Sequence, residues 1–597
     1  MIKVSDYIVN FLVEKGIKDV FFIDGSACAS MIVAVARNKN LRYFCPHHEQ
    51  AGAFAVDGYY KASGKLSAMI ATSGPAGQNL LNGIAASYYD SIPAIYLTGN
   101  INSKFMKPNN EIRQRGFQEN DIVSMVKPVT KYSSMVLKPE LIRYELEKAY
   151  YFATTGRPGP VLLDIPMDIQ QSTVNENELI GYRLLPMRKD TTFIDQHINK
   201  ILDMLDKAKR PVILLGGGVR LAQADDVVKA LINELKVPVF TTWNMIDFCP
   251  NNYFYYGGRV GTFGGDGRNF GIQNCDLLIS IGSRISGRIT GGMVSTFARG
   301  AKKVIVDIDP AELVWQQVKG DLNIVCDAKV FAEEFLKIVK ERKLEFNFRS
   351  WMSQVFDWRM QYSVMKKEYW MQENVNPYVF VKILSDEMKE GDVLVHEAGG
   401  NCVVTSQAFE AKQGQRVFSN NGNSSLGYAL PAAIGASIAT KKQVICITGD
   451  GGLNFNIQEF QTLKHYMLPV KVFIFNNDAY GITKAYRDTN FQSEYAGVDA
   501  EHGNSNPNFV KVADAYGLKT FKIDSFSEPR LRNIIREVLS YPGPVVCDVN
   551  MKGFYDYQPK LGWRSPIEDQ YPFLPREEFR RQMIIDPIEG WEDPKYP

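Results

Sequence analysis

The sequence lacks the features that would place the protein in a membrane or on a nucleic acid. No stretch of the 597 residues reaches the ~18 uninterrupted apolar residues that a membrane-spanning helix needs. Lys and Arg (68 residues) nearly balance Asp and Glu (66 residues), and the net charge of +2 provides no basic surface for nucleic acid or anionic lipid. We therefore expect neither kind of partner.

Cysteine is scarce and scattered along the chain. The eight cysteines form no CxxC pair and no tight cluster, which excludes a cysteine-ligated zinc site. Several of them lie inside apolar runs such as QVICITGD, where cysteine acts as a small apolar residue. The first residues, MIKVSDYIVNFLVEKG, predict a helix rather than a leader peptide. These observations predict a cytoplasmic protein in a reduced compartment.

Short β-branched runs alternate with helical patterns along most of the chain, which predicts an α/β protein with parallel sheets. The length allows roughly four domains at about 150 residues each. The pattern instead groups into three domains, at 1–170, 190–345 and 375–555. We expect a polar linker over 171–199, a connecting segment over 344–373 and a tail over 556–597 that lies on the surface.

Each domain is expected to be doubly wound, with helices on both faces of a parallel sheet. The candidate strands of the first domain are 20–23, 67–71, 93–98 and 160–165. The candidate strands of the second domain lie in PVILLGGG, VPVFTT, DLLISIG and KVIVDID. The candidate strands of the third domain are VLVH, VICITG, VKVFIFN and PVVCDV.

The most informative motifs follow two consecutive strands of the third domain. Gly-Asp-Gly-Gly (449–452) ends the first strand, and Asn476-Asn477 ends the second. Parallel strands end at the same edge of a sheet, so Asp450 and Asn477 are expected to share one crevice. Their oxygens suit Mg²⁺, and glycine amides can approach a diphosphate. On its own, Gly-Asp-Gly predicts only a tight turn after a strand. The strand–helix–strand arrangement of the two motifs favours a ligand-binding site instead.

This pair of motifs resembles the thiamine diphosphate fingerprint of the pyruvate decarboxylase and acetohydroxyacid synthase superfamily. The resemblance implies that Asp450, Asn477 and the carbonyl of Ala479 hold Mg²⁺. It also implies a doubly wound fold of three domains: an N-terminal domain that binds the pyrimidine, a central domain, and a C-terminal domain that binds the diphosphate.

The resemblance further implies a glutamate early in the chain, and CPHHEQAGAFAVDGYYKASGK supplies Glu49. A buried carboxyl facing the aminopyrimidine of thiamine stabilises the imino tautomer that removes the C2 proton, and burial should raise its pKa. The alternative is a solvated helix cap formed by His47, His48 and Glu49. The following segment disfavours that alternative, because ATSGPAGQNLLNGIAASYYDSIPAIYLTG is similar to a family segment.

From these motifs the resemblance to the acetolactate synthase catalytic subunit covers about residues 1–550. The segment 116–123 resembles a loop that lines the active site, and 424–431 resembles the segment that holds thiamine in its V shape. The resemblance implies catalytic roles for Glu49, Gln118 and Ser26, and substrate contacts by Phe117, Arg288 and Tyr486. The implied cofactor contacts are Glu49, Ser73, Asn79, Gly400, Asn401, Ser424, Leu426, Gly449, Gly451, Gly452 and Ile482.

The central domain raises the question of a flavin. Gly216-Gly217-Gly218 follows a strand but is not GxGxxG, so an ordinary nicotinamide site is poorly supported. The resemblance nevertheless implies FAD contacts, because matching positions are occupied by Arg157, Gly216, Gly217, Gly218, Arg284, Asp307 and Asp327. Guanidinium and glycine amide groups suit a diphosphate. Any FAD would be structural, because the reaction needs no net electron transfer.

The departures from the family pattern gather on the acceptor side. Ser26 replaces a glycine, Met167 replaces a lysine, Tyr486 replaces a tryptophan, and Arg284-Ile285-Ser286-Gly287-Arg288 loses two aspartates. We expect an acceptor other than, or additional to, a second 2-keto acid. The tail sequence PIEDQYPFLPREEF resembles thiamine enzymes of bacterial surface-polysaccharide clusters, some of which add an acetyl branch to a keto-sugar nucleotide.

Together these observations predict a thiamine diphosphate- and Mg²⁺-dependent carboligase. It would decarboxylate a 2-keto acid, with pyruvate the favoured one, and transfer the two-carbon unit to a carbonyl acceptor. A homodimer is the minimal unit that the resemblance implies, with a tetramer left open. Two alternatives remain, an inert regulatory subunit with the thiamine fold and a nicotinamide oxidoreductase. The intact set of Glu49, Asp450 and Asn477 argues against the first.

Overall fold

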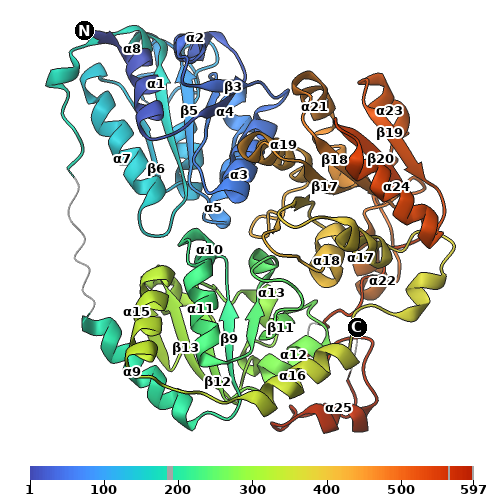
Figure 1. Ribbon diagram of the computed structural model, residues 1–597. Coiled ribbons are helices and arrows are strands. Elements are labelled where there is room, and N and C mark those ends of the chain that lie inside the picture. Colours follow the sequence, from blue (N-terminus) through green and yellow to red (C-terminus); the bar gives the residue numbers. More distant parts are fainter. Residues whose placement is uncertain (110, 184–191, 563–564, 595–597) are drawn as a thin grey trace.

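The computed structural model describes residues 1–109, 111–183, 192–562 and 565–594, without the side chains of residues 192 and 266. Three six-stranded parallel sheets each form the centre of one domain, with helices on their faces (Figure 1). The prediction of three parallel-sheet domains is therefore confirmed. Within the described part of the chain, no helix is long and apolar enough to cross a membrane.

The first sheet has the strand order β3-β2-β4-β5-β7-β6. Its strands are β2 (Asp19–Phe22), β3 (Arg42–Phe44), β4 (Ala68–Ala71), β5 (Ala94–Asn100), β6 (Tyr132–Met135) and β7 (Pro160–Pro166). A small antiparallel pair, β1 (Ile2–Lys3) and β8 (Thr173–Val174), joins the two ends of this domain.

The central sheet has the order β11-β10-β9-β12-β13-β14. Its strands are β9 (Pro211–Leu215), β10 (Val239–Thr241), β11 (Tyr256–Arg259), β12 (Leu277–Ile281), β13 (Lys302–Asp307) and β14 (Leu322–Val325). With strands numbered within the domain the order is 3-2-1-4-5-6, the order of dinucleotide-binding sheets.

The third sheet has the order β16-β15-β17-β18-β20-β19. Its strands are β15 (Val393–His396), β16 (Arg416–Phe418), β17 (Val444–Gly449), β18 (Val470–Asn476), β19 (Lys519–Ile523) and β20 (Val545–Asn550). Numbered within their domains, the first and third sheets have the same order, 2-1-3-4-6-5. This shared topology agrees with the two domains being diverged copies of one ancestral unit.

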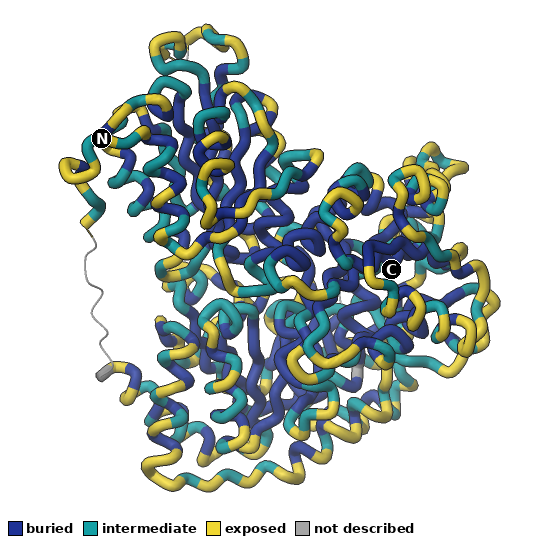
Figure 2. The backbone as a smooth tube through the Cα atoms, turned by 45° about the horizontal axis from the view of Figure 1, so that its top comes forward, coloured by how far each residue is buried: buried dark blue, intermediate teal, exposed yellow. Residues whose placement is uncertain are grey.

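Alternate residues of the first sheet enter two separate apolar clusters. Met69 and Tyr96 belong to a cluster that is shared with the third domain, whereas Ile70 and Leu97 pack under α1 (Val4–Glu14) and its neighbours. Figure 2 shows the buried backbone gathered inside each domain. Because both faces are covered, the inner strands are continuous apolar runs.

Two helices rich in small residues join the first and third domains. These are α3 (Glu49–Ser63) and α19 (Ala429–Thr440), which lie against each other in Figure 1. A Cβ at Gly58 would lie 2.2 Å from the carbonyl oxygen of Ala432, and one at Gly435 would lie 1.9 Å from that of Ala55. The contact is reciprocal and leaves no room for a side chain at either glycine.

The expected linker and connecting segments are partly helical. Helix α9 (Thr192–Lys207) begins inside the predicted linker 171–199, because its apolar face completes the core of the central domain. Residues 184–191 of that linker, and with them the predicted start of the central domain, lie outside the described residues. The connecting segment 344–373 contains α16 (Arg349–Gln361), which packs on the central domain.

The tail is more deeply integrated than a surface segment. Glu568 and Gln570 are fully buried. Arg299 donates from Nη1 to the Glu568 carboxylate at 2.7 Å, and the amide of Gly265 donates to Gln570 Oε1 at 2.9 Å. The expectation of a tail lying over the surface therefore needs correction, since buried polar pairs fix this segment to the central domain.

Candidate active site

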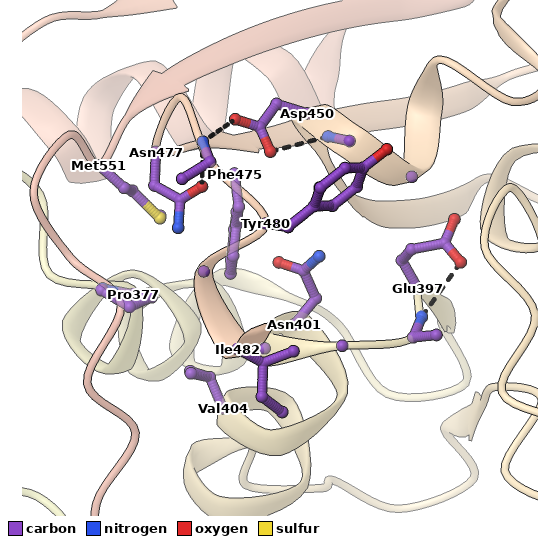
Figure 3. Close-up of a pocket in the computed structure, with 18 of the residues that line it drawn as sticks. Pro377, Glu397, Asn401, Val404, Asp450, Phe475, Asn477, Tyr480, Ile482 and Met551 are labelled. Carbon is purple, nitrogen blue, oxygen red and sulfur yellow. Dashed lines mark hydrogen bonds between the residues drawn. The ribbon is translucent and has the colours of Figure 1, made fainter. Parts of the chain in front are cut away.

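A cavity of about 110 Å³, called here the Asp450 cavity, lies at the C-terminal ends of β15, β17 and β18 (Figure 3). The loop after each of these strands contributes part of the wall, as expected for parallel strands that end at one edge. Of the predicted residues, those that line it are Gly400, Asn401, Leu426, Gly449, Asp450, Gly451, Gly452, Asn477, Ala479 and Ile482.

Asp450 and Asn477 lie side by side in this cavity (Figure 3). The amide of Ala479 is 3.3 Å from Asp450 Oδ2 and 3.3 Å from Asn477 Oδ1, so it donates to both. Asn506 Nδ2 also donates to Asp450 Oδ2, at 3.1 Å. The three residues predicted to hold a metal are therefore in contact with one another.

Burial raises the pKa of Asp450 to about 7. The carboxyl accepts hydrogen bonds from backbone amides, but these do not offset its removal from water. A nearby cation would favour the ionised form of such a group. The electrostatics of this position therefore suit a metal ligand.

Two side chains pack closely against the glycine turn that follows β17. A Cβ at Gly451 would lie 2.4 Å from the ring of Tyr480, and one at Gly452 would lie 2.8 Å from Glu397 Cγ. A side chain at either glycine would therefore collide with Tyr480 or Glu397. Because both glycines line the cavity, their backbone forms part of its wall, as the approach of a diphosphate requires.

Glu397 lines the same cavity, although sequence reasoning did not single it out. The carboxyl accepts hydrogen bonds from the amides of Ala398 at 3.1 Å, Tyr428 at 3.3 Å and Ala429 at 3.2 Å. Burial raises its pKa to about 7. Its position directly after strand β15, like that of Asp450 after β17, was a signal in the sequence that could have identified it.

A second group of predicted residues gathers at the C-terminal edge of the first sheet. Glu49 is the first residue of α3, and Asn79 Nδ2 donates to Glu49 Oε2 at 3.0 Å. His48 caps the helix by accepting from the amide of Gln50 at 3.1 Å. Gln118 lies against Gly74, and its φ of 60° places it in the left-handed region.

Among the described residues, this N-terminal group does not line the Asp450 cavity. Ser26 and Phe117 are exposed, with 84% of Phe117 accessible to solvent, while Ser73 is buried. The third domain does contact the turn before Glu49, because the amide of His47 donates to Glu459 Oε1 at 3.0 Å. Burial raises the pKa of Glu459 to about 7.

A much larger cavity, of about 1140 Å³, lies where the three domains meet and is called here the interdomain cavity. The residues predicted to contact a flavin all line it: Arg157, Gly216, Gly217, Gly218, Arg284, Asp307 and Asp327. Ser424 and Arg288 also line this cavity. Two of the charged groups have protein partners, since Arg157 donates to Glu312 at 2.6 Å and Asp327 caps a helix.

A third cavity, of about 150 Å³, lies beside the Asp450 cavity along α22 (Gly481–Asn490) and is called here the α22 cavity. Tyr486, which is 49% exposed, lines it together with Ile482 and Phe263. The guanidinium of Arg288 lies 5.8 Å from the centre of the Phe263 ring. Phe263 thus lines the cavity together with Tyr486 and also lies beside the predicted substrate residue Arg288.

The fold and these cavities define an enzyme of the three-domain thiamine diphosphate class, and comparison with known proteins agrees. Residues 2–125, 198–335 and 397–549 match the N-terminal TPP binding domain, the central domain and the C-terminal TPP binding domain of thiamine pyrophosphate enzymes. The matches cover the larger part of each described domain.

The chain belongs to the acetolactate synthase large-subunit family of these enzymes. It is 32% identical to a probable acetolactate synthase large subunit of Methanocaldococcus jannaschii, over 92% of this chain and 91% of that protein. It is 31% identical to the chloroplastic acetolactate synthase of Arabidopsis thaliana, over 92% of this chain and 81% of that protein. The protein is accordingly a thiamine diphosphate-dependent carboligase of acetolactate synthase type.

Proposed function

We propose that this enzyme decarboxylates pyruvate and joins the two-carbon unit to a carbonyl acceptor, using the Asp450 cavity as its cofactor site. The observation that carries the proposal is the contact of Asp450, Asn477 and Ala479 at the edge of the third sheet. Thiamine diphosphate, when bound, supplies the electron sink for decarboxylation. The protein supplies orientation, charge and an apolar surrounding.

Mg²⁺ is assigned to Asp450 Oδ, Asn477 Oδ1 and the carbonyl of Ala479. The donor set fits this ion, since it consists of hard oxygens and leaves positions for diphosphate oxygens and water. The burial of the Asp450 carboxyl supports the assignment, because a cation beside it would offset the cost of holding its charge away from water. Gly451 and Gly452 line the cavity with backbone alone, which suits the close approach of a diphosphate.

A homodimer is proposed as the minimal active unit, as the family resemblance implies. Glu49 would face the cofactor held by the Asp450 cavity of a second copy. Support comes from the separate placement of the two groups and from the exposure of Phe117 beside Gln118. Gln118, Phe117 and Ser26 would then form the wall opposite Leu426 and Ile482.

The acceptor is proposed to bind in the α22 cavity, beside Tyr486. Tail residues Lys560 and Leu561 also line this cavity, a few residues before the segment 566–579 that resembles thiamine enzymes of surface-polysaccharide clusters. The resemblance of that neighbouring segment supports a second candidate acceptor, a keto-sugar nucleotide, alongside a second 2-keto acid. Lys560, whose ammonium pairs with Asp556 at 2.9 Å, would contribute positive charge at the wall of this cavity. Arg288 lies outside the cavity, beside the Phe263 ring that lines it, and would favour an acidic acceptor from there.

The acceptor is tested by incubating the enzyme with pyruvate and a panel of carbonyl compounds. The panel contains pyruvate alone, 2-ketobutyrate, simple aldehydes and keto-sugar nucleotides, and products are identified by mass spectrometry. We expect CO₂ release and a product heavier than one acceptor by a two-carbon acetyl unit. An enzyme that releases CO₂ from pyruvate but adds nothing to any acceptor would contradict the carboligation proposal.

FAD is proposed to occupy the interdomain cavity in a structural role. The cavity is lined by Gly217, by the guanidinium of Arg284 and by the carboxylates of Asp307 and Asp327, which suit a diphosphate and ribose hydroxyls. The amides of Gly216 and Gly218 already donate to backbone carbonyls, so these two glycines would provide close approach of the backbone only. Substituting Gly217→Leu would place a side chain into this space, because a Cβ there already lies 3.2 Å from Asn244. We expect denatured wild-type protein to release about one flavin per chain and the variant to release little.

A matched control is Gly287→Leu, since a Cβ at Gly287 meets no atom within 4 Å and the residue does not line the cavity. This variant should keep its flavin. Wild-type protein that releases no flavin after expression in flavin-replete cells would overturn the assignment.

A further inference from the structure

Tyr557 belongs to the tail, yet its side chain lines the Asp450 cavity. The residue is only 8% exposed, and it also lines the neighbouring α22 cavity. It follows strand β20 and is brought to the cavity by the segment around Phe554, whose carbonyl accepts from Asn477 Nδ2 at 2.9 Å. The tail therefore reaches the same edge of the sheet as the proposed metal ligands.

The position of the Tyr557 hydroxyl is defined by two glycines that line the same cavity. A Cβ at Gly400 would lie 2.0 Å from this oxygen, and a Cβ at Gly481 would lie 2.9 Å from it. The phenol oxygen thus occupies the space that a side chain at residue 400 would fill. The loop after β15 has no side chain of its own at this point, and the tail provides one instead.

The Tyr557 hydroxyl makes no hydrogen bond to the residues that the structure describes, yet it is not one of the unpartnered side-chain atoms that are fully buried, so its oxygen is accessible from the cavity that the residue lines. A polar group that is held in place without a protein partner and faces a cavity is available to a ligand. The neighbouring groups are glycine amides, Asn401 and Asp450, which together suit an anionic, oxygen-rich ligand with a divalent cation.

We propose that the Tyr557 hydroxyl donates a hydrogen bond to a diphosphate oxygen of the bound cofactor, so that the tail contributes a cofactor-binding residue. The inference rests on the proposed use of the Asp450 cavity as the cofactor site. It goes beyond that proposal because it adds a residue from outside the three domains. No covalent step is involved, since the phenol remains protonated and acts only as a donor.

The test is Tyr557→Phe, which keeps the ring and removes the hydroxyl. Titration calorimetry of the full-length protein measures the Kd of thiamine diphosphate and, separately, of inorganic pyrophosphate, both with Mg²⁺. We expect each Kd to rise about 10-fold, the usual effect of losing a hydrogen bond to a charged acceptor. The Tm of the unliganded variant should match that of the wild type.

Tyr555→Phe is the matched control, because Tyr555 lies in the same segment but lines neither cavity. Its Kd values should equal those of the wild type. Gly400→Ala is a second variant: its Cβ would displace the phenol oxygen, and it should weaken binding of both ligands even if Tyr557→Phe folds poorly.

Three outcomes would overturn the inference. The first is an unchanged Kd for both ligands in Tyr557→Phe. The second is weaker binding of thiamine diphosphate with unchanged binding of pyrophosphate, because the hydroxyl would then contact another part of the cofactor. The third is weaker cofactor binding in Asp450→Asn with unchanged binding in Tyr557→Phe and Gly400→Ala. That result would contradict the role of Tyr557 but would still support the Asp450 cavity as the cofactor site. Failure of the wild type to bind thiamine diphosphate would instead overturn the proposed function.

Discussion

Replacing Glu49 by glutamine is expected to lower the rate of CO₂ release from pyruvate by about 100-fold or more. The substitution keeps the shape of the side chain and the contact with Asn79, whose amide donates to Glu49 Oε2 at 3.0 Å. It removes the carboxyl group that, facing the aminopyrimidine, would stabilise its reactive tautomer. Release of CO₂ is measured directly, with thiamine diphosphate and Mg²⁺ at saturating concentrations.

The control for this experiment is Glu140→Gln, an exposed glutamate of the same domain. Its rate should equal that of the wild type. The Kd of thiamine diphosphate for Glu49→Gln should change much less than the rate, because the proposed anchoring groups are in the third domain. Wild-type rates from Glu49→Gln would show that another group performs this proton transfer.

Replacing Asp450 by asparagine is expected to weaken Mg²⁺-dependent binding of thiamine diphosphate by about 100-fold or more. The variant keeps the size of the side chain but removes the charge that faces the cation. Calorimetry at several Mg²⁺ concentrations separates loss of metal affinity from loss of cofactor affinity. Dialysis of the wild type against a chelator should likewise abolish activity, and added Mg²⁺ should restore it.

Asp478→Asn is a close control for Asp450→Asn. Asp478 is in the same loop as Asn477 but is exposed and does not line the cavity. Its φ of 58° is a conformation that asparagine adopts readily, so the loop should be preserved. If both variants bound the cofactor as tightly as the wild type, the metal would have to be held elsewhere.

The strands that sequence patterns predict are the four inner strands of each sheet. In the first sheet these are β2, β4, β5 and β7, and the two missed strands are the edges β3 and β6. The same holds for the central sheet, with β11 and β14 missed, and for the third, with β16 and β19 missed. Inner strands are covered on both faces and are therefore continuous apolar runs. The missed edge strands are partly exposed (β3, β6, β14 and β19), only three residues long (β16), or buried but poor in apolar side chains, as is β11 with its sequence Tyr-Gly-Gly-Arg.

The sequence could predict those residues of the candidate site that come directly after a strand. Asp450 and Asn477 each follow an inner strand, and parallel topology brings such residues together. Tyr557 could not be predicted in this way, because nothing local shows that a tail residue lies beside Gly400. Its placement depends on packing between segments more than 150 residues apart. Long-range packing of this kind leaves no periodic signal in a single sequence.

Helix α3 crosses α19 at Gly58, and Glu49 is the first residue of α3. A small rotation of α3 about this crossing point would therefore displace Glu49. At about 1.5 Å per residue, Glu49 is roughly 13 Å from the pivot at Gly58, so a tilt of about 5° would move its carboxyl by roughly 1 Å. Displacements of this size can reduce catalytic rates about 100-fold. A Cβ at Gly58 or Gly435 would collide with the backbone of the facing helix. These two glycines therefore fix the angle between the helices, and through it the position of the Glu49 carboxyl, which neither glycine touches.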